Sequence, residues 1–181
     1  MTVSEEYTDN LYLTRDNREE DFITTVRPGF TLSFLGRSSQ LALAYDPSYS
    51  WYAKNPENDT LRHSARLTSW DDVSRNTRIY LNDTFLYTEE PYQEGDTDGR
   101  TGRDPYYTNT ASIGLNQQFG RNDSIEIALN HRILRNEDDD YEDSESTNPV
   151  LNLEYWFLPQ FGLETACMWV LSSVGLRNDY N

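Results

Sequence analysis

The chain has 181 residues, of which 31 are acidic and 15 are basic, and its formal net charge is −16. This acidity argues against a nucleic-acid partner, because phosphate binding needs basic patches, and the one cysteine, Cys167, excludes an intramolecular disulfide framework and a cysteine-rich metal site. The mean hydropathy of −0.82 points toward a soluble protein, but hydropathy detects membrane helices and is nearly blind to membrane strands.

Side chains alternate with a period of two residues along most of the chain, which predicts β-strands. In chain order, eight or nine strands are expected at residues 6–13, 22–34, 40–53, 60–70, 77–88, 106–119, 124–135, 148–157 and 162–171. In the clearest case, residues 40–53, large apolar side chains at odd positions alternate with small and polar ones at even positions. These strands exceed the roughly 5–6 residues of an ordinary globular strand and match the roughly 9–11 residues of a tilted membrane strand.

The connections between the expected strands alternate between short turns and longer, polar loops. The four longer connections, residues 14–21, 54–59, 89–104 and 136–146, hold 19 acidic and five basic residues, which is nearly all of the net charge. In an up-and-down meander, alternate connections lie at opposite ends, so the acidic loops gather at one rim. Short periplasmic turns and long extracellular loops are typical of outer-membrane barrels.

One face of the expected strands carries charges of both signs in mid-strand. In an outer-membrane barrel these residues would line a wet lumen; they are Arg27, Asp46, Arg62, Arg66, Arg78, Glu126, Arg132 and Glu154. Two interpretations of these arginines are equally supported by the sequence. Charged rings set pore selectivity, so the arginines could make the lumen tolerant of anions or sugars, or they could form salt bridges with the acidic members of the same set.

The opposite face is apolar and has aromatic residues toward the strand ends. In a membrane barrel they would form an interfacial girdle at headgroup level; they are Phe22, Phe34, Tyr49, Trp51, Tyr87, Tyr107, Phe119, Tyr155 and Phe157. In a soluble two-layer sandwich the same side chains would be core, and strand length favours the girdle. Asp83 falls on this apolar face, which predicts either a β-bulge that turns it inward or a different register.

Several short segments carry a resemblance to a known family. They are residues 6–13 (EYTDNLYL), 21–24 (DFIT), 27–30 (RPGF), 45–49 (YDPSY), 63–65 (HSA) and 153–157 (LEYWF). Over roughly residues 4–165 the chain resembles the putative beta-barrel porin 2 family of bacterial outer-membrane proteins, similar to those linked to exopolysaccharide or PEP-CTERM export. The resemblance implies an outer-membrane location and no catalytic residues. Members of the family are longer, so it also implies a fragment, with strands missing after about residue 171.

The ends of the chain agree with a fragment. Residues 1–6 have neither the basic start nor the apolar stretch of a signal peptide, and no apolar run approaches the roughly 20 residues of a membrane helix. We therefore expect one all-β domain over residues 1–181: an antiparallel up-and-down meander of 8–9 long strands that forms a transmembrane β-barrel or about half of one.

The function expected from these observations is a porin-like pore or scaffold in the bacterial outer membrane, without catalytic residues, metal or cofactor. Its partners would be the lipid bilayer and lipopolysaccharide, with polysaccharide or small polar solutes as cargo and no nucleic acid. The alternatives are a soluble β-barrel or sandwich that binds a sugar or apolar ligand, and a lipid-modifying enzyme that uses His63 or His131. Against the enzyme, Ser64 neighbours His63 and so points to the opposite face.

Two acidic loop segments, residues 96–99 (DTDG) and 138–140 (DDD), raise the hypothesis of a calcium site. The spaced pattern of a dedicated calcium loop is absent, so a solvated acidic loop is the favoured interpretation. Under the hypothesis, divalent ions would bridge these loops to anionic lipopolysaccharide.

Overall fold

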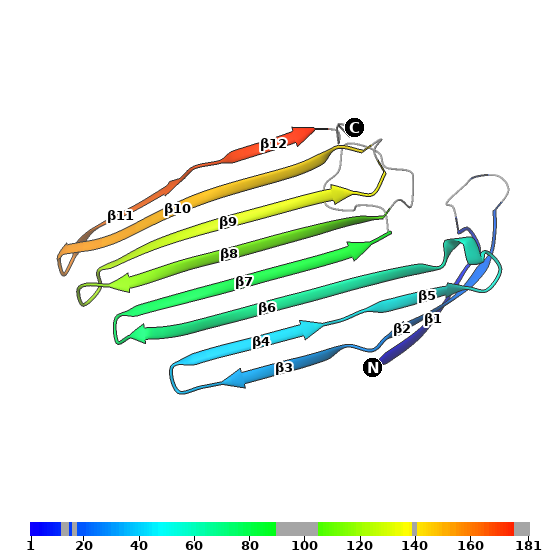
Figure 1. Cartoon of the computed structure of the whole chain (residues 1–181), viewed down its shortest axis with the longest axis horizontal. Coiled ribbons are helices and arrows are strands. Elements are labelled where there is room, and N and C mark those ends of the chain that lie inside the picture. The colour runs from blue at the N-terminus through cyan, green and yellow to red at the C-terminus, as the bar shows by residue number, and fades with distance from the viewer. Residues whose placement is uncertain (12–14, 16–17, 90–104, 139–140, 176–181) are drawn as a thin grey trace, which may run out of the picture.

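The computed structural model of the chain is a single antiparallel sheet arranged as a meander (Figure 1). It describes residues 1–11, 15, 18–89, 105–138 and 141–175. The path of hydrogen-bonded strands runs from the first strand to β11, and no pairing in the described chain joins its two ends. The expected all-β meander, about half of a barrel, is therefore confirmed.

The sheet contains twelve strand segments and one short 3-10 helix, η1 (Pro56–Asn58). The strands are β1 (Thr2–Thr8), β2 (Asp21–Arg27), β3 (Phe30–Leu35), β4 (Ser39–Tyr45), β5 (Ser48–Tyr52), β6 (Thr60–Ser74), β7 (Thr77–Thr88), β8 (Tyr106–Gln118), β9 (Ser124–Asn136), β10 (Asp143–Leu158), β11 (Phe161–Met168) and β12 (Leu171–Gly175). Three pairs of segments, β2 with β3, β4 with β5, and β11 with β12, are interrupted halves of one long strand. The described segments therefore correspond to nine long strands, within the number expected.

The first two interruptions lie side by side in the sheet. One falls at Pro28-Gly29 and the other at Asp46-Pro47, because Val26 pairs with Tyr49 just before them and Phe30 with Tyr45 just after. Proline has no N–H to donate to a ladder, so it ends regular pairing. We call these two interruptions the crease. The backbone N–H of Asp46 instead donates to the carbonyl of Ser64 at 2.8 Å, which keeps the crease attached to β6.

Three strand boundaries differ from the sequence expectation. The first strand was expected at residues 6–13, of which 12 and 13 lie outside the described residues; β1 instead spans Thr2–Thr8, where it pairs in register with β2, and residues 9–11 are not in a strand. β6 and β10 run beyond the expected 60–70 and 148–157. Ion pairs between neighbouring strands hold these polar ends in the ladder, as Asp72 does with Arg78 at 2.6 Å.

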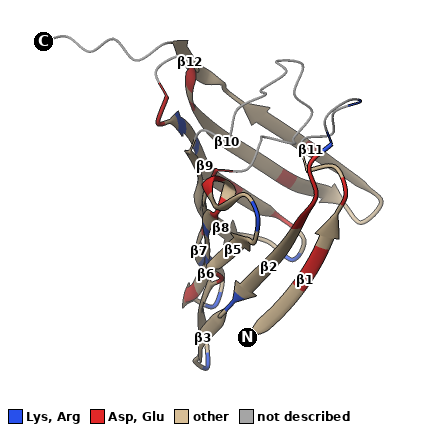
Figure 2. Ribbon diagram, turned by 90° about the vertical axis from the view of Figure 1, so that its right-hand side faces the viewer, with Lys and Arg blue, Asp and Glu red and all other residues tan. Residues whose placement is uncertain are grey.

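The two ends of the sheet differ in the way the sequence predicts. The turns that follow β3, β6, β8 and β10 are short and lie together at the left of Figure 1, whereas strands β1, β5, β7 and β9 end toward the right. Figure 2 shows that the sheet is curved, with the β1–β2 rim and the β10–β11 rim bending toward the same side. We call the two ends of the sheet the short-turn end and the loop end.

Within the described residues, no second layer packs on the sheet. In the described chain, the buried apolar residues are Tyr106 and Ala128, while many large apolar side chains are exposed. Among the described residues, no helix has the length and apolar character needed to cross a membrane. This single layer is not the two-layer sandwich considered from the sequence.

Candidate functional site: the polar and apolar faces of the sheet

Residues paired directly across neighbouring strands point to the same face of a sheet. The register therefore sorts the side chains into two faces. We call one the apolar face, which holds Leu43, Leu67, Leu81 and Ile113, and the other the polar face, which holds Arg66, Thr84, Thr110 and Arg132.

The register brings most of the predicted lumen residues to the polar face. They are Arg27, Arg62, Arg66, Arg78, Glu126, Arg132 and Glu154. Asp46 lies outside the strands, in the crease, where its carboxylate occupies the space that a side chain at Gly29 would fill. That these residues line a lumen stays a prediction.

The predicted girdle aromatics gather on the apolar face. The register places Phe22, Phe34, Tyr49, Trp51, Tyr87, Tyr107 and Tyr155 there. Phe119 stacks on Tyr155, with ring centroids 6.4 Å apart, and so joins them. Phe157 falls at the register shift between Trp156 and Leu158, where the pairing assigns it no face. Their contact with a membrane interface stays a prediction.

Asp83 lies on the apolar face, opposite Leu67 and Ala111, and the pairing of β7 with β6 and β8 is continuous at that point. The expected β-bulge or altered register is therefore wrong. The carboxylate instead accepts a hydrogen bond of 3.0 Å from the side-chain amide of Asn109, which also lies on the apolar face. The carboxylate is thus accommodated by a hydrogen-bond donor on the same face and not by a change of face.

Aromatic side chains on the polar face, close to the short-turn end, form a hydrogen-bonded network. The guanidinium carbon of Arg78 lies 4.1 Å from the ring centroid of Trp70, a cation–π contact. Two guanidinium nitrogens of Arg78, Nε and Nη2, donate to the two carboxylate oxygens of Asp72, at 2.6 and 3.0 Å. The indole N–H of Trp70 donates to Gln40 at 3.0 Å. Arg78 is thus fixed between a ring and a carboxylate.

Tyr80 is the partner of Trp70 in the register and lies on the same face. Its ring lies over Gly114, because a Cβ at that glycine would overlap the phenol end of the ring. Its hydroxyl reaches across β8 and donates to Glu126 of β9 at 2.8 Å. Glu126 also accepts 2.8 Å from the amide of Asn152 in β10.

Sequence reasoning did not single out Trp70, Tyr80 or Trp156. Their signal is an aromatic residue at a position that alternation assigns to the polar face, and for Tyr80 and Trp156 a glycine directly opposite on the next strand. The register is needed to see the second half of that signal, since the glycines lie far away in the sequence or across a turn.

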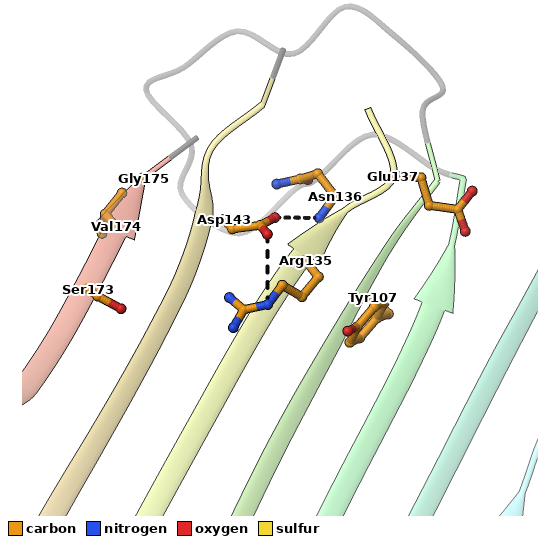
Figure 3. A pocket seen from close by; sticks show the side chains of 8 residues that line it. All are labelled: Tyr107, Arg135, Asn136, Glu137, Asp143, Ser173, Val174 and Gly175. Carbon is orange, nitrogen blue, oxygen red and sulfur yellow. Dashed lines mark hydrogen bonds and ion pairs between the residues drawn. The ribbon is translucent and has the colours of Figure 1, made fainter. Parts of the chain in front are cut away.

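A cluster of charged side chains lies at the loop end of the apolar face, around a pocket beside Tyr107 (Figure 3). Arg135 donates to Glu145 at 2.6 Å and lies 3.7 Å from Asp143. Asp143 also accepts the backbone N–H of Asn136 at 2.9 Å. Because the carboxylates are engaged by Arg135 and the backbone, the cluster fastens the ends of β9 and β10 together.

Both histidines lie on the apolar face toward the loop end. His63 contacts the hydroxyl of Tyr45 through Nδ1 at 2.6 Å, and Ser64 points to the polar face, opposite Leu86. His131 contacts the hydroxyl of Thr147 through Nδ1 at 2.8 Å, and its Nε2 lies 3.9 Å from Glu145.

The acidic segments of the calcium hypothesis, residues 96–99 and all but Asp138 of residues 138–140, lie outside the described residues. In the parts of the chain that are described, no group of three or more His, Cys, Asp or Glu side chains is arranged to hold a metal ion.

Of three comparisons with known proteins, the one with family models found a match. A search of the curated proteins and a search of the solved structures each found no significant match. A family model, described as putative beta-barrel porin 2, matches residues 1–152, from β1 into β10. The match covers most of the chain and ends somewhat earlier than the resemblance in the sequence suggested. The chain therefore belongs to the putative beta-barrel porin 2 family.

Proposed function

We propose that the chain works in the bacterial outer membrane as a porin-like β-barrel element, with its polar face toward a water-filled lumen and its apolar face toward lipid. The observation that carries this proposal is the sorting of side chains between the faces. Charged residues of both signs occupy the polar face, while exposed apolar residues such as Leu81, Ile113 and Ile127 occupy the other. Exposed large apolar side chains recur on successive strands of this face, whereas soluble monomers rarely expose contiguous apolar patches larger than a few hundred Å².

The proposed mechanism is diffusion of small polar solutes along the polar face, without catalysis. Service in exopolysaccharide export or surface assembly is the finer proposal, supported by the family resemblance. A hydrated polysaccharide needs a lumen that offers hydrogen bonds in place of water, and the polar face offers arginine, carboxylate and amide groups for this purpose. The partners would be the bilayer and lipopolysaccharide, with the acidic loop end near the outer leaflet.

Neighbouring residues of β8 supply a sharp test. Ile113→Lys places a charge on the apolar face, and the matched control Ser112→Lys places it on the polar face of the same strand. A lysine facing lipid near the midplane costs about 2–4 kcal/mol. We expect Ile113→Lys to lower the stability of the protein folded into phospholipid vesicles by about that amount, measured by urea titration, and Ser112→Lys to leave it nearly unchanged.

Two results would contradict the proposal. One is equal destabilisation by the two lysines, which would mean that the faces do not differ in environment. The other is a wild-type protein that is monodisperse and folded in plain buffer without detergent, which would favour the soluble ligand-binding alternative.

A lipid-modifying enzyme is a second candidate, and the contacts of His131 with Thr147 and Glu145 are the observation in its favour. Against it, Glu145 is held more closely by Arg135, at 2.6 Å, than by the imidazole, at 3.9 Å. Replacing His131 with alanine tests this candidate in a phospholipid hydrolysis assay. Unchanged lipid turnover, or none in the wild type, would remove it.

A further inference from the structure

Two aromatic rings on the polar face lie flat against the backbone of the neighbouring strand. Tyr80 covers Gly114, and Trp156 covers Gly162, where the site of a Cβ lies 2.7 to 3.0 Å from three adjacent carbons of the indole. Each glycine is the direct partner of its aromatic residue in the register. Because the backbone covers one side of each ring, the other side faces away from the sheet.

Hydrogen bonds fix the orientation of both rings and place carboxylates at their edges. Tyr80 donates to Glu126, which also accepts from Asn152. The indole N–H of Trp156 donates to Glu154 at 2.8 Å, and the backbone N–H of Trp156 donates to Asp123 in the nearby turn, also at 2.8 Å. Each carboxylate has further lone pairs with which to accept hydroxyl groups.

Both rings lie near the short-turn end, but in different rows of the register, because the row through Tyr80, Gly114 and Ala128 reaches β10 at Val150 and not at Trp156. Tyr80 is a few residues from the turn between β6 and β7, and Trp156 is a few residues from the turn between β10 and β11. Glu126 is equally close to the turn between β8 and β9. The rings and their carboxylates therefore form an oblique row along the short-turn end of the polar face, because each strand is shifted relative to the next.

Aromatic faces beside fixed hydrogen-bonding groups are the combination that recognises a sugar. The C–H face of a pyranose packs on an aromatic ring, while its equatorial hydroxyls donate to carboxylates and amides at the edge. The charge around the rings indicates which class of sugar they would bind. Glu154 lies directly opposite Glu164. The guanidinium of Arg78, two residues from Tyr80 on the same face, is engaged by Asp72, so carboxylates outnumber cations around the rings. Such a row repels uronic acids and accepts uncharged sugars.

We propose that Tyr80 and Trp156, with Glu126, Asn152 and Glu154, form a subsite for neutral oligosaccharides at the short-turn end of the polar face. The inference rests on the proposed function, because it needs the polar face to be reached by solute. The alternative is that each ring only shields a glycine in the sheet, and the experiment below separates the two.

The test measures binding of maltohexaose, a neutral linear hexasaccharide, to the full chain folded in detergent micelles by isothermal titration calorimetry. Trigalacturonate serves as the anionic comparator. We expect maltohexaose to bind, Tyr80→Leu and Trp156→Leu each to weaken the dissociation constant at least tenfold, and Tyr80→Phe, which keeps the ring, to weaken it about two- to threefold. The matched control is Trp169→Leu, which removes an exposed indole between β11 and β12 and is expected to leave the constant unchanged.

The inference is overturned if maltohexaose does not bind the folded protein at millimolar concentration, if Tyr80→Phe and Tyr80→Leu weaken binding equally, or if trigalacturonate binds as tightly as the neutral sugar. Micelle binding does not require a membrane pore, so this result stands apart from the lysine test of the proposed function. If Ile113→Lys destabilises the protein as expected but maltohexaose does not bind, the proposed function holds and the subsite is overturned.

Discussion

Asp83 is the clearest conflict between a residue and its surroundings. It lies on the apolar face with Asn109 as its hydrogen-bonding neighbour. A carboxylate that faces lipid is unfavourable, though less so than the roughly 2–4 kcal/mol of a lysine or arginine at the midplane. We expect Asp83→Leu to stabilise the vesicle-folded protein by about 1–2 kcal/mol, since Asn109 keeps an acceptor in the carbonyl of Thr84 at 3.4 Å. Urea titration in vesicles measures this change.

The matched control for Asp83 is its neighbour Asn82, which points to the polar face. Asn82→Leu places an apolar side chain toward the proposed lumen and is expected to give no stabilisation. If Asp83→Leu destabilises the protein while Asn82→Leu does not, the face that holds Asp83 is not in contact with lipid.

Glu20 and Lys54 form an exposed pair in the loops that precede β2 and follow β5. The hydrogen bond from Lys54, and then that from Tyr7, lowers the pKa of Glu20 below its usual range, and the hydrogen bond with Glu20 raises the pKa of Lys54. A lowered carboxyl pKa stabilises the folded state above the ordinary value of about 4.3, and this contribution is lost as pH falls through the lowered value. A raised ammonium pKa stabilises it below about 10.4, with loss as pH rises through the raised value.

The pair is therefore expected to hold across neutral pH and to open in acid. In an NMR titration of the side-chain carboxyl carbons, Glu20 should titrate below an ordinary glutamate, and Lys54→Gln should move its midpoint upward. Glu57, an exposed glutamate in η1, serves as the control in the same spectra. A Glu20 midpoint that ignores the Lys54 substitution would mean that the two side chains do not pair in solution.

At the scale of the element, the crease is where β2–β3 and β4–β5 lose regular pairing together. Gly29 leaves the space that the Asp46 carboxylate occupies, so a larger residue must displace that side chain. We expect Gly29→Val to destabilise the protein by about 1–3 kcal/mol, the usual cost of overpacking, in a urea titration. The control is Gly175→Val in β12, because no atom lies within 4 Å of its added Cβ. Equal effects at the two glycines would show that the crease is not tightly packed.

Sequence reasoning predicted long regular strands well and their irregular parts poorly. Residues 77–88 were expected and observed as β7, because alternation there runs unbroken between two turns. Alternation also assigned Arg66 and Asp83 to their correct faces, since a period of two fixes every side chain once one is placed. It did not show the crease, because Pro28 and Pro47 break pairing within segments whose alternation continues. The first strand was misplaced because its register depends on β2 and not on its own pattern.

The polar-face aromatics show a second limit of the sequence. Tyr80 and Trp156 read as exceptions to the alternation, and their meaning depends on Gly114 and Gly162 on neighbouring strands. Pairing across strands is a property of the register, which one sequence specifies only through turns and faces. The partner of each ring, and hence the candidate subsite, could be found only in the folded sheet.

At the scale of the whole molecule, the sheet has an uneven distribution of charge. The four longer connections expected from the sequence carry 19 acidic and five basic residues, while the polar face mixes both signs. In the proposed barrel, this arrangement sets a negative rim at the loop end of a lumen that is nearly balanced. Such a rim raises the local concentration of cations, and its reach is the Debye length of about 10 Å at 0.1 M salt.

The reversal potential across a planar bilayer under a potassium chloride gradient therefore shows whether the acidic loop end or the polar face sets ion selectivity. We expect cation selectivity at about 0.01 M salt that falls steeply toward 1 M, where the Debye length shrinks to about 3 Å. Replacing Glu137, Asp138 and Glu142 with their amides should reduce the low-salt selectivity, whereas Glu5→Gln, on the apolar face of β1, should not. Selectivity for chloride, or selectivity that does not change with salt, would place control in the arginines of the polar face and not in the acidic rim.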